Sequence, residues 1–538
     1  MKKILAIFLT LLLLFSLTAG CEKTSAPTPS GGDTPAPAGT SDRVLHLRKP
    51  APVASLDWEK TTDLLDMGIV WIQMTEGLYG MNEAEGGYFN LLAKDIQVSD
   101  DQKTYTVSLV DATFQNGDPM KAGDVVFSYE RAMANPKFNY VTSMIEKIEA
   151  SDDKTVVFTL KYPYSPIAHT FFTVKIQSEK EVTAAGEQFG TVPHKAGTGP
   201  YYATKYDVGG DLELEAYENY WRGSPNIKKV QYKVISEDSA AVIAFENGEI
   251  DYLNDAPVAE WEAIEKKAAG NSLLVKGNNI RSLYINWQSP QVGDILKKQE
   301  VREAICYAVN RDNLVQGATN GLGVAAYEYV PSDYVSTAPN YKDGKFELYD
   351  HNLEKSKELL LKAGYTEEEI KAGIDLGTLV TYGGVNSDKG KAAQVLQASL
   401  AEAGFKVQVD VKPDYNGAAP VLHTFKYDLA IFGDGGNYDF NNIRQQVHSE
   451  SEGMDLILYK APDSPFDGEK IEKWLDDAVN TSDVAKRKAI YTDLWAYIQE
   501  TATILPLYHN PVGVAWSSDL DPESISPTYY HIFNFKWK

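Results

Sequence analysis

Two segments early in the chain alternate polar and apolar side chains residue by residue. They are 104–109, with the sequence TYTVSL, and 155–160, with the sequence TVVFTL, and each follows a Ser-Asp-Asp turn. A period of two residues is typical of strands that bury one face, and Ser and Asp are common in turns. We therefore predict a strand at each of the two segments.

Two further segments show the spacing and end signals of helices. Residues 125–133 follow Asp124, and an acidic residue there favours the start of a helix. Residues 353–363 lie between Asn352, a preferred N-cap residue, and Gly364, which is typical of the position just after a helix. We predict a helix over each segment.

A third helix is predicted over 301–309, where Val301, Ile305 and neighbouring apolar residues share one face. Cys306 lies beside this face. We therefore interpret its thiol as a small buried hydrophobic group rather than a nucleophile.

The segment 376–442 indicates the fold class. A strand over 376–382 is followed by a helix over 389–403, by Gly404 at the helix end, and by a strand over 405–411. Another strand is expected over 427–432. Strand–helix–strand units of this length make right-handed crossovers in parallel sheets, so we predict an α/β fold.

The loop that leaves the last of these strands is a candidate ligand-binding loop. It contains Gly433, Asp434, Asn437, Tyr438 and Asp439. Ligands of open α/β sheets bind beyond the carboxyl ends of the strands, and glycines allow the backbone to approach a ligand closely. The alternative interpretation is a tight turn without a ligand.

The N-terminus has the layout of a secretory signal peptide. Lys2 and Lys3 precede an apolar run over 4–17, which is shorter than the roughly 20 residues of a membrane-spanning helix. Small residues then lead to Cys21, as in a bacterial lipobox, although Thr18 stands where that motif usually has Leu. We predict a signal peptide over 1–20 and lipidation of Cys21. Residues 22–42 are rich in Pro, Ser, Thr and Gly, which predicts a disordered linker.

Composition narrows the class of protein. The chain has 538 residues, enough for several domains, and its net charge of −24 argues against nucleic-acid binding. Its 2 cysteines exclude a disulfide scaffold or a zinc ribbon, and 32 tyrosines supply rings for a binding cleft. No nucleophile elbow, dense metal-ligand motif or dinucleotide fingerprint with its leading strand occurs, so we expect no enzyme activity, no metal and no cofactor.

Several short motifs span most of the chain after residue 42. They are Ser55-Leu-Asp57, Glu76-Gly-Leu-Tyr79, the long segment 99–130, Gly197-Thr-Gly-Pro-Tyr201, Asn219-Tyr-Trp-Arg-Gly223, Phe245-Glu-Asn-Gly-Glu-Ile-Asp251 and 301–311. Together, and in this order, they resemble the extracellular solute-binding proteins of family 5, which serve ATP-dependent importers of oligopeptides, dipeptides, nickel and some sugars.

The resemblance implies a type II periplasmic-binding-protein fold, in which two lobes close over a ligand and a third, additional lobe packs on the first. We expect lobe I to comprise 43–85, 195–280 and 505–538. The additional lobe would be 86–194, and lobe II would be 281–504, with the ligand cleft between lobes I and II.

The resemblance also implies which residues meet the ligand. In peptide-binding members an aspartate in the loop after the strand equivalent to 427–432 pairs with the peptide's α-ammonium, and Asp434 or Asp439 would hold that place here. Trp71, Trp287 and Tyr438 are further candidates for the cleft wall, with burial in the core as the alternative. The family's Asp-Tyr-x-Asp-Pro pattern is disrupted here, with Phe440 in place of the proline.

The expected function is capture of an extracellular solute by hinge closure and its delivery to a membrane permease. A peptide is the expected solute, and an oligosaccharide or a nickel chelate is the alternative; for the chelate Arg281, Arg444 or His448 would serve. The expected partners are this solute, the permease subunits of the ABC transporter and, through a lipid anchor, the membrane. We expect a monomer on the outer face of the cell membrane, which is periplasmic if an outer membrane is present, and no contact with nucleic acid.

Overall fold

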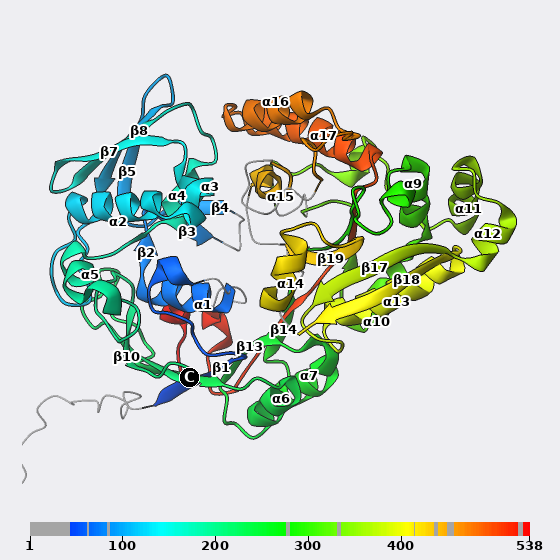
Figure 1. Cartoon of the computed structure of the whole chain (residues 1–538). Helices are drawn as coiled ribbons and strands as arrows, with labels where there is room; N and C mark the ends of the chain where they lie inside the picture. Colours follow the sequence, from blue (N-terminus) through cyan, green and yellow to red (C-terminus); the bar gives the residue numbers. More distant parts are fainter. Residues whose placement is uncertain are drawn as a thin grey trace, which may run out of the picture. The chain divides into compact units, whose positions relative to one another are not determined.

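The computed structural model describes residues 43–61, 64–82, 87–275, 280–330, 335–413, 415–434, 439–448, 457–525 and 531–538. The chain builds three larger sheets there, and we name three lobes after them. Lobe I contains the seven-stranded sheet, the additional lobe the four-stranded sheet and lobe II the six-stranded sheet (Figure 1). The predicted signal peptide, Cys21 and the linker lie outside the described residues.

The sheet of lobe I mixes parallel and antiparallel neighbours. Its strands are β1 (Val44–Lys49), β10 (Tyr201–Tyr206), β11 (Leu212–Ala216), β12 (Lys229–Val234), β13 (Tyr252–Ala256), β14 (Ser272–Val275) and β21 (Val512–Trp516). Their order is β10-β11-β12-β1-β13-β21-β14, and β1 is parallel to β12 and β13. The helices α6 (Asp238–Glu246) and α7 (Trp261–Ala268) pack against β13 and β21.

The additional lobe is an antiparallel sheet with one long helix against it. Its strands are β5 (Ala93–Val98), β6 (Thr104–Leu109), β7 (Ile145–Asp152) and β8 (Thr155–Leu160), in the order β5-β6-β8-β7. Helix α2 (Ala122–Ala134) packs against β7 and β8, and α3 (Asn139–Thr142), α4 (Ile167–Thr173) and α5 (Glu179–Ala185) surround it (Figure 1). β6 and β8 confirm the two predicted strands, because alternate residues of each are buried.

Short strands connect lobe I with the additional lobe. β2 (Glu76–Gly77) pairs with β9 (Lys175–Ile176), and β3 (Tyr79–Asn82) forms a hairpin with β4 (Gly87–Asn90). A Cβ atom at Gly77 would overlap the carbonyl oxygens of Phe171 and Phe172. Glycine in the Glu-Gly-Leu motif therefore lets α4 approach β2 closely.

Lobe II contains the predicted strand–helix–strand unit. Its strands are β15 (Ile280–Ile285), β16 (Val324–Ala325), β17 (Ile374–Tyr382), β18 (Phe405–Lys412), β19 (Leu429–Asp434) and β20 (Ile504–His509), in the order β16-β20-β15-β19-β17-β18. β17 is parallel to both β18 and β19, which confirms the predicted parallel arrangement, whereas β15, β16 and β20 are antiparallel to their neighbours.

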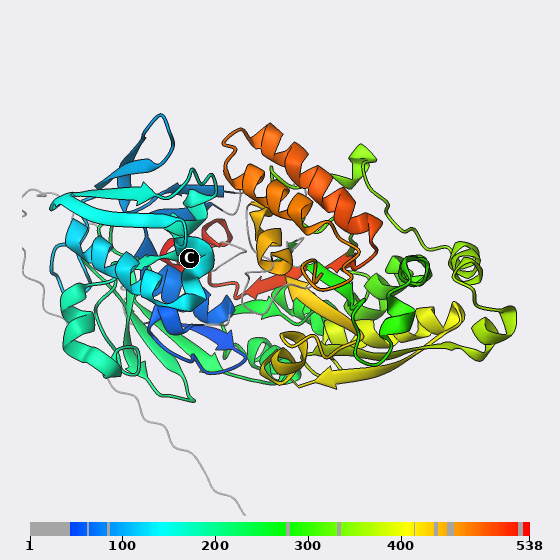
Figure 2. The same cartoon turned by 45° about the horizontal axis from the view of Figure 1, so that its top comes forward.

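Helices cover the sheet of lobe II. They include α9 (Gln299–Ala308), α10 (Arg311–Thr319), α11 (Leu353–Lys362), α13 (Asp388–Glu402), α14 (Tyr415–Leu422), α16 (Gly468–Val479) and α17 (Val484–Glu500). α16 and α17 run side by side in both views (Figures 1 and 2). The predicted helices are confirmed as α2, α9, α11 and α13, and Gly364 and Gly404 follow α11 and α13 with φ of +94° and +88°.

The chain passes between lobes I and II at two neighbouring places. It leaves β14 at Val275 and enters β15 at Ile280, and it returns from β20 at His509 to β21 at Val512. Val275 pairs with Val512 in one sheet, and Ile280 pairs with His509 in the other, so the two connections begin and end next to each other. Two adjacent connections of this kind can act as a hinge between two lobes.

One predicted lobe boundary falls at a different place in the structure. Residues from 505 onward were expected in lobe I, but β20 belongs to the sheet of lobe II, where it pairs with β15 and β16. The chain changes lobes after His509. The mostly apolar sequence of β20 is compatible with the core of either lobe. Only its pairing with β15 and β16 assigns it to lobe II.

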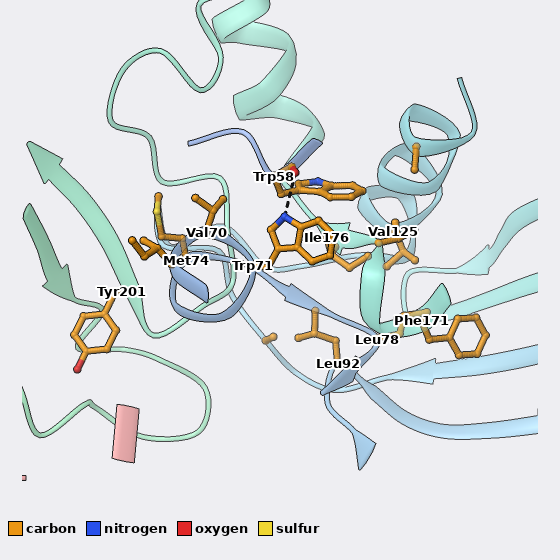
Figure 3. Packing of buried hydrophobic residues seen from close by; sticks show 14 of the residues in the cluster. Trp58, Val70, Trp71, Met74, Leu78, Leu92, Val125, Phe171, Ile176 and Tyr201 are labelled. Carbon is orange, nitrogen blue, oxygen red and sulfur yellow. Dashed lines mark hydrogen bonds between the residues drawn. The ribbon is translucent and has the colours of Figure 1, made fainter. Parts of the chain in front are cut away.

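The core of lobe I and the additional lobe is continuous, and Trp71 lies within it (Figure 3). Its side chain is 6% exposed, and its indole N–H donates to the Trp58 carbonyl at 3.1 Å and to Thr61 Oγ1 at 2.7 Å. The rings of Trp58 and Trp71 meet edge to face, with centroids 5.8 Å apart. Trp71 therefore has the surroundings of a core residue whose polar atom is satisfied.

Candidate ligand-binding site

The carboxyl end of β19, where the candidate loop begins, lies against a buried ion pair. Arg281 at the start of β15 faces Gly433 across the sheet, and a Cβ atom at Gly433 would overlap the guanidinium. Arg281 Nε donates to Asp388 Oδ2 at 2.6 Å, and the Tyr508 hydroxyl donates to the same oxygen at 3.3 Å. A larger residue at 433 would therefore displace the Arg281 side chain from its position beside Asp388.

Asp388 is held as an anion at the start of α13. Burial raises the pKa of its carboxyl, but the charges of Arg281 and Lys389 and the hydrogen bond from Arg281 outweigh burial and lower the pKa to about 2. This arrangement fixes the edge of the sheet from which the candidate loop departs.

Asp439, at the far end of the loop, is already engaged by the protein. Its carboxylate pairs with Arg487 Nη2 of α17 at 2.6 Å, and its Oδ1 accepts the Asn441 backbone N–H at 2.9 Å. Asn441 in turn donates from Nδ2 to the Tyr164 hydroxyl of the additional lobe at 3.3 Å and accepts from Tyr491 at 3.2 Å. Asp439 thus anchors a polar network that links lobe II to the additional lobe.

A cavity of about 860 Å³ opens beside this network. The additional lobe and the neighbouring strand β4 supply most of its wall. Lobe II supplies Val479 and five residues between 439 and 448. Its polar and aromatic lining comprises Tyr88, Lys137, Asn139, Tyr140, Thr142, Ser143, Lys161, Tyr162, Tyr164, His169, Asp439, Asn441, Asn442, Arg444 and His448. The volume is typical of small-ligand sites, which span about 300–1,000 Å³.

The aromatic side of the cavity contains a neutral histidine. The Tyr88 hydroxyl and His169 Nδ1 are 2.9 Å apart, and burial together with the charge of Lys175 lowers the pKa of His169 to about 4. These groups therefore offer neutral hydrogen-bonding atoms and ring faces near pH 7.

The opposite side of the cavity carries basic side chains that pair with carboxylates outside the cavity. Arg444 Nη2 lies 3.1 Å from Asp476 Oδ1 and 3.2 Å from His448 Nε2. His448 Nε2 is also 2.8 Å from Glu472 Oε2. Burial raises the pKa of Glu472, but bonds from Lys460 and Tyr459 and the charge of His448 bring it down to about 2. The imidazole and guanidinium are thus held in place by carboxylates outside the cavity.

The cavity is closed on one side by contacts between the additional lobe and the turn from α16 to α17. The Ser165 backbone N–H donates to the Val479 carbonyl at 2.7 Å, and Ser165 Oγ donates to the Thr481 carbonyl at 2.7 Å. Tyr164, beside Ser165, is 6% exposed. The additional lobe and lobe II therefore meet directly next to the cavity.

The structure brings together only some of the residues expected at the site. Asp439 lines the cavity, and Gly433 lies at the end of β19; Asp434 ends the same strand. Trp287 is 2% exposed, with its indole N–H donating to the Ile457 carbonyl at 2.8 Å, so it and Trp71 lie among core residues. Asn437 and Tyr438 lie outside the described residues.

The cavity also differs in place from the expected cleft between lobes I and II, since its walls come from the additional lobe and lobe II. Sequence reasoning missed Tyr88, Tyr140, Tyr162, Tyr164 and His169. The surplus of tyrosine was the available signal, but nothing in the local pattern tells which tyrosines converge. Among the described residues, no group of His, Cys, Asp and Glu is arranged to hold a metal ion, and none of their helices is long and apolar enough to cross a membrane.

Two α/β lobes joined by two neighbouring connections are the arrangement of the type II periplasmic binding proteins. The comparisons with known proteins agree: the sequence model of the bacterial extracellular solute-binding proteins, family 5 (middle region), matches residues 88–448. The chain belongs to this family. It is the solute-binding component of an ABC importer.

Relatives cover most of the chain. The glutathione-binding protein GsiB of Escherichia coli O6:K15:H31 (strain 536) is 26% identical over 465 residues, which cover 84% of this chain and 86% of GsiB. The crystal structure of NikA from Brucella suis in complex with Fe(III)-EDTA has a TM-score of 0.79 at 21% identity, covering 92% of this chain and 100% of NikA. The oligopeptide-binding protein AppA of Bacillus subtilis in complex with a nonapeptide has a TM-score of 0.76 at 21% identity, covering 92% of this chain and 99% of AppA.

Proposed function

We propose that the cavity beside Asp439 is part of the ligand site and that the solute is a peptide or a peptide-sized relative of one. The observation that carries this proposal is the shared wall: a solute there touches the additional lobe and lobe II at once. A ligand that gains contacts to both sides only in the closed arrangement shifts the population toward closure. Asn139, Asn441 and Ser143 offer the neutral donors and acceptors that peptide groups require.

The proposal is tested by the mass of whatever co-purifies with the protein. Native and denaturing mass spectra of the protein purified from its host are compared, and the expected result is extra mass in the native spectrum that resolves into short peptides. Extra mass in hexose steps, or a metal isotope pattern, would contradict the peptide assignment and support the alternatives of an oligosaccharide or a nickel chelate.

We also propose that Cys21 carries the lipid anchor, after removal of residues 1–20, and that residues 22–42 tether the binding lobes to the outer face of the cell membrane. Small residues directly before Cys21 support the first step, and the Pro/Ser/Thr/Gly-rich composition supports the second. The binding lobes would then act as a tethered monomer beside the permease.

Cys21→Ser is expected to abolish incorporation of a fatty-acid label and to release the protein from the membrane fraction. The matched control is Cys306→Ser, which removes the other cysteine of the chain, a buried one. Labelling that persists in Cys21→Ser would contradict the assignment.

A further inference from the structure

The charged residues that line the cavity are mostly basic, whereas the chain as a whole is acidic. The whole sequence has 75 acidic and 51 basic residues. Around the cavity the described lining has the cations Lys137, Lys161 and Arg444, and Asp439 is the one carboxylate among them. His169 adds no charge near pH 7, since its pKa is lowered to about 4 by burial and by Lys175. The wall is therefore formally cationic inside a strongly acidic protein.

Asp439 is poorly suited to receive an amine from the ligand. The Arg487 guanidinium lies 2.7 Å from Oδ1 and 2.6 Å from Oδ2, and the Arg487 side chain is 6% exposed. Oδ1 also accepts the Asn441 N–H. An incoming ammonium would have to share the carboxylate with a buried guanidinium, and leaving a buried charge without its partner is costly. Arg487 therefore already neutralises the one negative charge among the described lining residues.

Lys161 is the cation whose charge no carboxylate balances. Its Nζ donates to the Ser143 carbonyl at 2.6 Å, and in the part of the chain that the structure describes it forms no ion pair. Lys103 Nζ donates to the Lys161 carbonyl at 3.2 Å, which holds the backbone of Lys161 at this position. Lys161 therefore presents a positive field at the exposed edge of the cavity.

The other two cations are offset, which singles out Lys161. Lys137 donates to the carbonyl oxygens of Glu59 and Thr61; burial lowers its pKa, and the charges of Glu59 and Asp57 oppose this. Arg444 faces Asp476. Around them, Asn139 and Ser143 supply neutral hydrogen-bonding groups that can bind a ligand of either charge.

We propose that this cavity prefers solutes with side-chain carboxylates over solutes with side-chain amines, and that Lys161 is a specificity-determining residue for that preference. The inference rests on the proposed function, since it names the class of peptide that the same cavity takes: an acidic one. A charge-assisted bond from Lys161 to a ligand carboxylate is favourable, whereas a ligand amine meets like charge at the rim.

The test uses three matched tripeptides with the full-length protein: Ala-Glu-Ala, Ala-Gln-Ala and Ala-Lys-Ala. Affinities are measured by calorimetry and checked by thermal shift. The wild type is expected to bind the Glu peptide about 10-fold more tightly than the Lys peptide, with the Gln peptide between them. Lys161→Glu should weaken the Glu peptide about 10-fold and leave the Gln peptide within about twofold.

Lys94→Glu is the control, because it makes the same change of charge at an exposed position of β5 outside the cavity wall. It should leave all three affinities unchanged. Equal binding of the Glu and Lys peptides by the wild type, or identical behaviour of the Lys161→Glu and Lys94→Glu variants, would overturn the inference while leaving the peptide assignment intact. Failure of all three peptides to bind would overturn the peptide assignment together with the inference.

Discussion

At the scale of the residue, the edge of the lobe II sheet at the end of β19 depends on a few close contacts between single side chains. Gly433 packs against the Arg281 guanidinium, and Arg281 is paired with Asp388. Because the pair is largely buried, removing one partner leaves the other charge uncompensated, which costs about 3–5 kcal/mol in well-buried pairs. The position of this sheet edge therefore depends on the ionised carboxylate of Asp388.

Asp388→Asn is expected to lower the free energy of unfolding at pH 7 by about 2–4 kcal/mol, because Arg281 keeps its charge and loses its counter-ion. The pH dependence should change as well. The folded pKa of about 2 lies below the ordinary 3.8, so the contribution of Asp388 is complete above pH 3.8 and is lost as pH falls through 2. About 1 kcal/mol of it should be gone at pH 3.

Urea unfolding of wild type and variant at pH 7, 5 and 3 measures both effects. Asp410→Asn is the control, since Asp410 forms a partly exposed pair with Lys412 at 2.8 Å on strand β18 of the same sheet. Its effect should stay below about 1 kcal/mol at every pH. A wild type and an Asp388→Asn variant with parallel pH profiles would contradict the assignment of the low pKa.

At the scale of the element, one carboxylate joins two helices of the additional lobe. Asp124 Oδ2 accepts the Lys121 N–H at the start of α2 at 3.0 Å, and its Oδ1 accepts the Glu179 N–H at the start of α5 at 3.1 Å. The first N–H groups of a helix have no partner within the helix, so one side chain here satisfies a donor at two helix ends. The arrangement fixes α5 beside α2.

Asp124→Ala is expected to lower the free energy of unfolding by about 1–2 kcal/mol, because both N–H groups lose their acceptor. Chemical denaturation measures the change. Asp153→Ala serves as the matched control, since the Asp153 side chain pairs with the same Lys121 residue at 2.9 Å on the surface. Its backbone carbonyl accepts the Ala122 N–H of α2 at 2.9 Å, and the substitution keeps that carbonyl. Equal losses in the two variants would show that the surface charge, not the capping, matters.

At the scale of the whole molecule, the additional lobe is a candidate for one of the two walls that enclose the ligand. It supplies much of the cavity wall, and its Ser165 meets the turn between α16 and α17 of lobe II. A contact between separate lobes beside the cavity contributes to holding a ligand if it forms on closure. It would then act on ligand release rather than on the stability of either lobe.

Ser165→Ala removes the bond from Oγ to the Thr481 carbonyl and is expected to speed dissociation of a bound peptide about 3- to 10-fold, because one hydrogen bond is worth about 0.5–1.5 kcal/mol. Stopped-flow tryptophan fluorescence measures the rate. The melting temperature without peptide should stay within about 1 °C of wild type. Ser224→Ala on lobe I is the control; an unchanged rate, or a lower melting temperature without peptide, would contradict a role in closure.

Much of the fold was predictable because its signals are local. The alternation in 104–109 and 155–160 is carried by the side chains themselves, and β6 and β8 have those bounds. The end residues Asn352, Gly364 and Gly404 predicted helix ends for the same reason. The lobe boundary at 505 was misplaced because strand pairing is not local: a fully buried, mostly apolar strand such as β20 carries no local signal of which sheet it will join.

The sequence by itself determined the class of the protein, since a lipobox-like start, α/β periodicity and an ordered series of motifs can be recognised along the chain. Only the tertiary structure decided which residues line the cavity and which of their charges are paired within the protein. Arg487 of α17 pairs with Asp439 although 48 residues separate them, and Tyr88, Lys161 and Arg444 come together from segments distant in the chain. Binding sites are made by such convergence, and the electrostatics of a group depend on neighbours that only folding supplies.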